Sequence, residues 1–179
     1  MAPEVDDQIL KDLWSTPQSK FLEDGARHEC GHATTLWRLA ILRSLPAPFT
    51  YIRLDPPNMR GEVAFNREVE QHLNIDERAA VKLSGLFAEY EAYEWDEDRW
   101  VERLELDSGN PNAFSDCLAI EELAQENNRR FNDLAIVAFR FLQSISDMRE
   151  IVTTSAEDLK IRLSMTYNEF DNLVARLNR

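Results

Sequence analysis

Apolar residues recur at helical spacing along most of the chain. Between Glu23 and Leu42 there are few helix breakers apart from Gly25 and Gly31, and Leu36, Leu39 and Ala40 recur at this spacing on one side. The same spacing runs from Ile75 to Tyr93. Each segment is therefore predicted to form a long helix, and Pro46 and Pro48 are expected to stop the first one.

A short stretch between these two helices has the pattern of a β-hairpin. Phe49–Leu54 is rich in β-branched and aromatic residues, Asp55–Asn58 has turn chemistry, and Gly61–Phe65 alternates between small or polar and apolar positions. We predict two paired strands here. The edge of the Phe49–Leu54 strand is expected to be exposed, where an extended peptide can add as a further strand.

The second half of the chain is predicted to be helical with interruptions. The strongly acidic stretch Glu89–Asp107 is expected to end the preceding helix and continue as a loop or a short helix. Ser108–Asn112 contains glycine and proline and is typical of a loop. Helical spacing resumes near Phe114 and continues, with a break, to about Arg149.

A last helix is predicted near the C-terminus. Ser155–Asp158 has the spacing of a capping box, which favours a helix beginning there and ending near Leu177. The fold class expected is therefore mostly α with a small β-sheet. Residues 1–150 are expected to form one domain, and residues 151–179 a helix packed on it. The apolar positions that favour packing over a partner interface are Leu159, Leu163, Tyr167, Phe170, Leu173 and Leu177.

Composition excludes several classes of function. The chain has 179 residues and a net charge of −13, without the clustered Lys and Arg that bind nucleic acid. No apolar run reaches the roughly 18 residues of a membrane span, and Met1–Gln18 does not resemble a secretory signal. We therefore expect a cytoplasmic protein with no nucleic-acid or membrane partner. Cys30 and Cys117 are expected to be buried free thiols.

The most specific chemical feature is an H-E-x-x-H motif at His28–His32 on the first predicted helix. Positions four apart on a helix differ by roughly 40°, so both imidazoles can reach one metal ion. Glu29 lies beside that direction, where a general base can take a proton from a metal-bound water. Cys30 points to the back of the helix, and Gly31 either leaves room beside the metal or packs tightly against another helix.

Four segments, in order, resemble the FtsH-type zinc proteases. Ala26–Ala33 resembles the H-E-A-G-H-A helix of that family, with cysteine in the place of its usual alanine. Thr50–Phe65 is similar to its strand, proline turn and second strand, and Gly85–Glu89 to its G-R-x-A-E segment, although leucine replaces the arginine. Ser108–Ala124 is similar to the loop and helix start that supply the third zinc ligand.

The resemblance implies a zincin-like helical metallopeptidase domain with Zn²⁺ as cofactor. By it, His28, His32 and Asp116 are the metal ligands and Glu29 is the catalytic base. Glu89 is then the carboxylate that orients a ligand histidine, although an ordinary place in an acidic run is an equal alternative.

Departures from the family narrow the expected function. The chain contains no G-x-x-x-x-G-K-[ST] phosphate loop, so it cannot itself use ATP to unfold a substrate. We expect an ATP-independent zinc metallopeptidase acting on flexible or unfolded polypeptide, and by family resemblance a homo-oligomer. The alternatives are a non-catalytic protein-binding module that retains the peptidase fold, and a structural helical protein whose motif is fortuitous.

Overall fold

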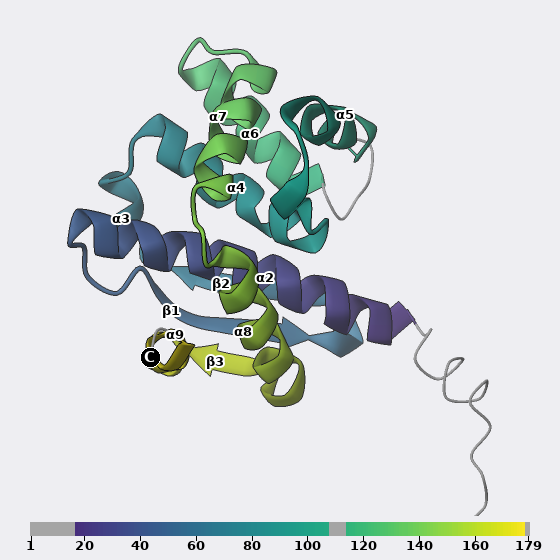
Figure 1. Cartoon of the computed structure of the whole chain (residues 1–179), viewed down its shortest axis with the longest axis vertical. Helices are drawn as coiled ribbons and strands as arrows, with labels where there is room; N and C mark the ends of the chain where they lie inside the picture. Colours follow the sequence, from purple (N-terminus) through teal and green to yellow (C-terminus); the bar gives the residue numbers. More distant parts are fainter. Residues whose placement is uncertain (1–16, 108–113, 178–179) are drawn as a thin grey trace, which may run out of the picture.

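Helix α2 (Pro17–Arg43) runs through the middle of the fold in the computed structural model, which describes residues 17–107 and 114–177 (Figure 1). Helix α4 (Ile75–Glu89) packs on one side of α2, and helix α8 (Met148–Arg162) and the sheet pack on another. The middle of α2, from Glu29 to Trp37, is consequently buried all round. The predicted helix over Glu23–Leu42 is confirmed, and the observed helix begins six residues earlier (23 − 17).

The predicted hairpin is present. Strand β1 (Phe49–Asp55) pairs antiparallel with β2 (Arg60–Phe65), and a single 3-10 turn at Pro56–Asn58 joins them. Met59 ends that turn in the left-handed conformation, with a φ of 50°. In the resulting register Leu54 pairs with Gly61, which places Gly61 near the start of β2.

The predicted exposed edge of Phe49–Leu54 is wrong, because a third strand covers it. Strand β3 (Ser164–Thr166) pairs antiparallel with β1, so the strand order is β2-β1-β3. Leu163 adopts a left-handed conformation with a φ of 61° and accepts a hydrogen bond from the Leu54 amide at 2.8 Å. Within the described part of the chain, β2 is an edge strand of this sheet.

Helix α4 (Ile75–Glu89) begins at a capping box, in which the Asn74 side chain accepts from the Glu77 amide and Glu77 accepts from the Asn74 amide. It ends before a short 3-10 turn at Ala92–Glu94. The small helix α3 (Arg67–Gln71), which the sequence did not predict, connects β2 to α4.

Helix α5 (Glu97–Asp107) shows that the acidic stretch is helical for three turns. Trp100 and Leu104, one turn apart, are fully buried. The Trp100 indole donates a hydrogen bond to the Ala135 carbonyl at 3.1 Å, which fixes α5 to α7 (Phe131–Gln143). Helix α6 (Phe114–Glu126) precedes α7, and the break expected between them is confirmed. The predicted loop at Ser108–Asn112 lies outside the described residues.

The capping box predicted at Ser155–Asp158 is wrong. Ser155 lies inside α8 (Met148–Arg162), is buried, and donates its hydroxyl hydrogen bond to the Ile151 carbonyl at 2.7 Å. Residues 151–179 are therefore not a single helix, because α8 ends, β3 follows and α9 (Tyr167–Leu177) comes last.

The C-terminal elements share the core of the helices before them. Leu159, Phe170 and Leu173 are buried in the same cluster as residues of α2 and α4, which confirms the packing interpretation for these positions. Leu163 is an exception at 37% exposed. Among the helices of residues 17–107 and 114–177, none is both long enough and apolar enough to cross a membrane.

Candidate metal centre

Three predicted ligands come together where α2, α4 and α6 meet. His28 and His32 project from one face of α2 with their Nε2 atoms 3.1 Å apart. Asp116, in the first turn of α6, places its Oδ2 atom 3.2 Å from Nε2 of His28 and 3.7 Å from Nε2 of His32. These side chains form a group that can hold a metal ion.

The spacing of these atoms fits a small tetrahedral ion. Ligand atoms that lie about 2.0–2.1 Å from zinc in a tetrahedron are separated from one another by about 3.3–3.4 Å. The three separations of 3.1, 3.2 and 3.7 Å fall around this value. Three protein ligands leave a fourth position open, as in catalytic zinc sites.

Both imidazoles are oriented through their other ring nitrogen. Nδ1 of His28 lies 3.1 Å from the Glu89 carboxylate, and Nδ1 of His32 lies 2.7 Å from the Val81 carbonyl oxygen. Because each of these partners accepts, each Nδ1 is the protonated donor. With Nδ1 engaged in this way, a metal ion can take the place of any proton on each Nε2, which is the arrangement that metal-binding histidines use.

Asp116 supplies an unsatisfied oxygen at the same place. Its Oδ2 atom is buried, and no described group donates to it in hydrogen-bond geometry. Buried polar atoms normally have a partner, so this oxygen is ready to accept one. A cation between the two imidazoles would satisfy it.

The electrostatics of the cluster favour positive charge. Burial opposes a charge on His28, yet the carboxylates of Asp116 and Glu89 outweigh it and raise the pKa of His28 to about 10. Burial alone would also raise the pKa of Asp116, but the contact with His28 lowers it below its usual range. Burial lowers the pKa of His32 to about 4, which keeps this imidazole in the neutral form that binds metals.

Gly85 of α4 makes room for the two rings. A Cβ atom at this position would lie 2.5 Å from Nε2 of both His28 and His32. Gly31 has a different role, because a Cβ there would collide with the Ser84 carbonyl and the Ala88 side chain of α4. The structure thus supports the tight-packing interpretation of Gly31, and the space around the ligand nitrogens comes from Gly85.

Glu29 lies between α2 and β2 and is 8% exposed. Its carboxylate contacts the backbone of β2 at Gly61, where a Cβ atom would lie 2.5 Å from Oε1. Burial raises the pKa of Glu29 to about 7. Within the described part of the chain, no side chain hydrogen-bonds this carboxylate, so its oxygens remain available.

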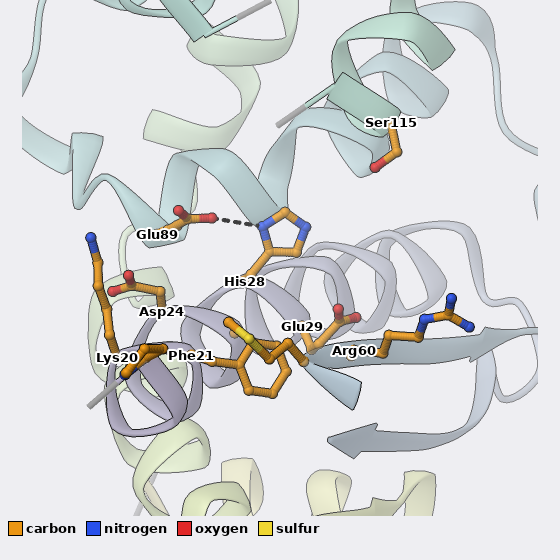
Figure 2. A pocket seen from close by; sticks show the side chains of 12 residues that line it. Lys20, Phe21, Asp24, His28, Glu29, Arg60, Glu89 and Ser115 are labelled. Carbon is orange, nitrogen blue, oxygen red and sulfur yellow. Dashed lines mark hydrogen bonds and ion pairs between the residues drawn. The ribbon is translucent and has the colours of Figure 1, made fainter. Parts of the chain in front are cut away.

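Glu29, His28 and Glu89 line a common open cavity of about 620 Å³. Figure 2 shows the His28 ring and the Glu29 carboxylate extending from α2, with Glu89 beside His28 and joined to it by a dashed line. The cavity therefore gives solvent and a ligand access to His28 of the metal cluster and to Glu29.

The remaining candidates lie elsewhere. His72, the third histidine of the chain, is exposed at the end of α3. Cys30 and Cys117 are buried free thiols, as predicted. Cys30 faces Ser155 of α8 rather than the metal cluster.

Comparison of the chain with protein-family models, with curated proteins and with solved structures found no match. The resemblance to FtsH-type proteases therefore stays a prediction from sequence. The support for a metal-binding cluster at His28, His32 and Asp116 is the distances between their ligand atoms.

Proposed function

We propose that this chain is an ATP-independent zinc metallopeptidase with a zincin-like domain. The observation that carries the proposal is one cavity lined both by His28, a member of the cluster of two imidazoles and a carboxylate, and by Glu29, a buried glutamate on the same helix whose carboxylate has no side-chain partner in the described residues. His28, His32 and Asp116 would hold the metal. Glu29 would be the general base.

Zinc is the metal that the donor set favours. Two imidazoles and one carboxylate, with a fourth position left for water, form a ligand set found in zinc hydrolases. All-oxygen sites suit magnesium or calcium instead. When bound, zinc acts as a Lewis acid, polarising a carbonyl and making water more acidic.

The residues of the chain supply the proton chemistry and the alignment. Glu29 accepts a proton from a water molecule that attacks the peptide carbonyl, and can then give it to the departing amine. Glu89 and the Val81 carbonyl hold the two imidazoles in the required tautomer. Gly61 lets the backbone of β2 approach Glu29 closely.

The substrate proposed is a flexible polypeptide in extended conformation. Strand β1 lies between two other strands, so β2 replaces it as the expected docking edge. A peptide that hydrogen-bonds to the outer edge of β2 would pass Gly61 and therefore Glu29. Because the sequence contains no phosphate loop for ATP, the substrate proposed is one that needs no unfolding before it binds.

The test separates metal binding from chemistry. Wild type and Glu29→Gln, both loaded with zinc, are incubated with an intrinsically disordered protein, and peptide-bond cleavage is followed by mass spectrometry. We expect Glu29→Gln to bind zinc like wild type and to lose cleavage by at least about a hundredfold. Glu68→Gln, the same change at an exposed position of α3, is the control and should cleave normally.

Equal cleavage by wild type and Glu29→Gln would remove Glu29 from the mechanism. Tight zinc binding by a wild-type protein that cleaves no disordered substrate would favour the non-catalytic binding module instead.

A further inference from the structure

The wall of the cavity next to Glu29 contains an arginine that the chemistry described above does not use. Arg60 is the first residue of β2 and precedes Gly61, the residue that contacts Glu29. It lines the same cavity as His28 and Glu29. Figure 2 shows its side chain extending from β2 on the side of the cavity where the Glu29 carboxylate lies.

Arg60 has no acidic partner in residues 17–107 and 114–177, although the chain carries 33 acidic residues against 20 Lys and Arg. The other arginine of the hairpin, Arg53, pairs with Glu62 across the strands at 2.6 Å. Glu62 is the acidic residue of β2 nearest to Arg60 in sequence, and this pairing engages it. The guanidinium of Arg60 is exposed and available to a ligand.

The other cation that lines the cavity, Lys20, is in a different position. Its charge acts on Asp24, one turn along α2, and Asp24 in turn lies close enough to Glu89 for the two carboxylates to repel each other. Two carboxylates therefore offset the charge of Lys20. Arg60 also has a carboxylate opposite it, Asp55 across the β1–β2 pair, but that carboxylate accepts from the Asn58 side-chain amide and makes no ion pair with Arg60, so the guanidinium is left to donate to a ligand.

We propose that Arg60 is a specificity residue that binds an acidic side chain of the substrate, close to the bond that is cleaved. This inference rests on the proposed function. A guanidinium donates two parallel hydrogen bonds to a carboxylate, which fixes direction as well as charge. Because Arg60 adjoins the Gly61–Glu29 contact, it reaches residues that flank a peptide carbonyl placed beside Glu29. The substrate class is an extended polypeptide with Asp or Glu near the scissile bond.

The experiment uses unstructured peptides that differ only in carrying Asp, Asn or Lys at one position, scanned along the peptide. Cleavage rates are measured with zinc-loaded wild type, Arg60→Gln and Arg60→Glu. Binding of the same peptides to zinc-loaded Glu29→Gln, with and without each Arg60 change, is measured by fluorescence anisotropy. Arg67→Gln, at an exposed position that begins α3 and lies outside the cavity lining, is the matched control.

We expect wild type to prefer Asp over Asn by about threefold to fivefold at one position, the size usual for a partly exposed charge pair. Arg60→Gln should abolish this preference, Arg60→Glu should reverse it in favour of Lys, and Arg67→Gln should leave it unchanged. The same pattern in the binding assay without cleavage by wild type would support Arg60 while refuting the peptidase. Equal treatment of Asp and Asn peptides by wild type in both assays, or a preference that survives Arg60→Glu, would overturn the assignment.

Discussion

Replacing Gly85 by alanine should disable metal binding while leaving the fold in place. Alanine is normally better than glycine inside a helix, by about 1 kcal/mol. Here the added Cβ atom would lie 2.5 Å from Nε2 of both His28 and His32, whereas unstrained contacts between heavy atoms are about 3.5 Å. Both rings must therefore move by about 1 Å.

That movement acts on the two hydrogen bonds that orient the rings. The bonds to Glu89 and to the Val81 carbonyl have lengths of 3.1 and 2.7 Å, and disturbing such buried bonds costs about 1–3 kcal/mol. After the gain in helix propensity, we expect metal-free Gly85→Ala to lose about 1–2 kcal/mol of unfolding free energy. The zinc affinity should fall by a hundredfold or more, because the ligand atoms no longer converge.

The assay is a zinc titration against a competing chelator, together with urea unfolding of the metal-free protein. Gly25→Ala is the matched control, since it lies on the same helix as His28 and its added Cβ would meet only the movable ring of Phe21, at 3.0 Å. Its zinc affinity should equal that of wild type. If Gly85→Ala binds zinc as tightly as wild type, the rings do not meet where α4 crosses α2, and this reasoning fails.

Three further substitutions probe the surroundings of the site. Asp116→Ala should weaken zinc by more than a hundredfold in the same titration, because one of three protein ligands is lost; an unchanged affinity would show that Asp116 is not a ligand. Glu89→Ala should lower the zinc affinity by about tenfold to a hundredfold, because His28 loses the partner that orients it. A change below twofold would show that Glu89 is an ordinary surface carboxylate. Tyr90→Phe removes a 2.6 Å hydrogen bond to the buried Asp107. Urea unfolding should show a loss of about 1–2 kcal/mol in the free energy of unfolding, while the zinc affinity stays that of wild type. An unchanged free energy of unfolding would contradict this prediction.

Periodicity predicted the elements that bury one continuous face, and it failed where the local pattern depended on distant partners. The hairpin and the helices containing His28 and Glu89 follow from spacing alone. The Ser155 motif satisfied a local capping rule, but burial of Ile151 and Leu159 on either side of it carries α8 straight through.

Long-range contacts also explain what the local pattern missed or left open in the fold. Strand β3 is only three residues long and is held by pairing with β1, which is far away in sequence. No local pattern therefore predicts it. Helix α5 is dominated by charged residues, and its helical state depends on burying Trp100 and Leu104 against α7. A count of acidic residues could not reveal that contact.

The site divides in the same way. The pair His28–His32 and the neighbouring Glu29 follow from helical geometry, because all three lie within two turns. Asp116 was reached only through family resemblance, since nothing local distinguishes it from other carboxylates at helix starts. Gly85 and Gly61 matter because a side chain at either position would collide with a site residue. Val81 contributes its backbone carbonyl, which accepts a hydrogen bond from His32. Such roles become visible only when the neighbouring elements are placed.

The central claim is that two imidazoles and one carboxylate hold a metal ion, and zinc content tests it most directly. Wild type and the double variant His28→Ala/His32→Ala, both purified without a histidine tag, would be compared by elemental analysis after equilibration with limiting zinc and gel filtration. The account predicts equimolar zinc in wild type and almost none in the double variant. Zinc-free wild type, or equal zinc in both proteins, would contradict it.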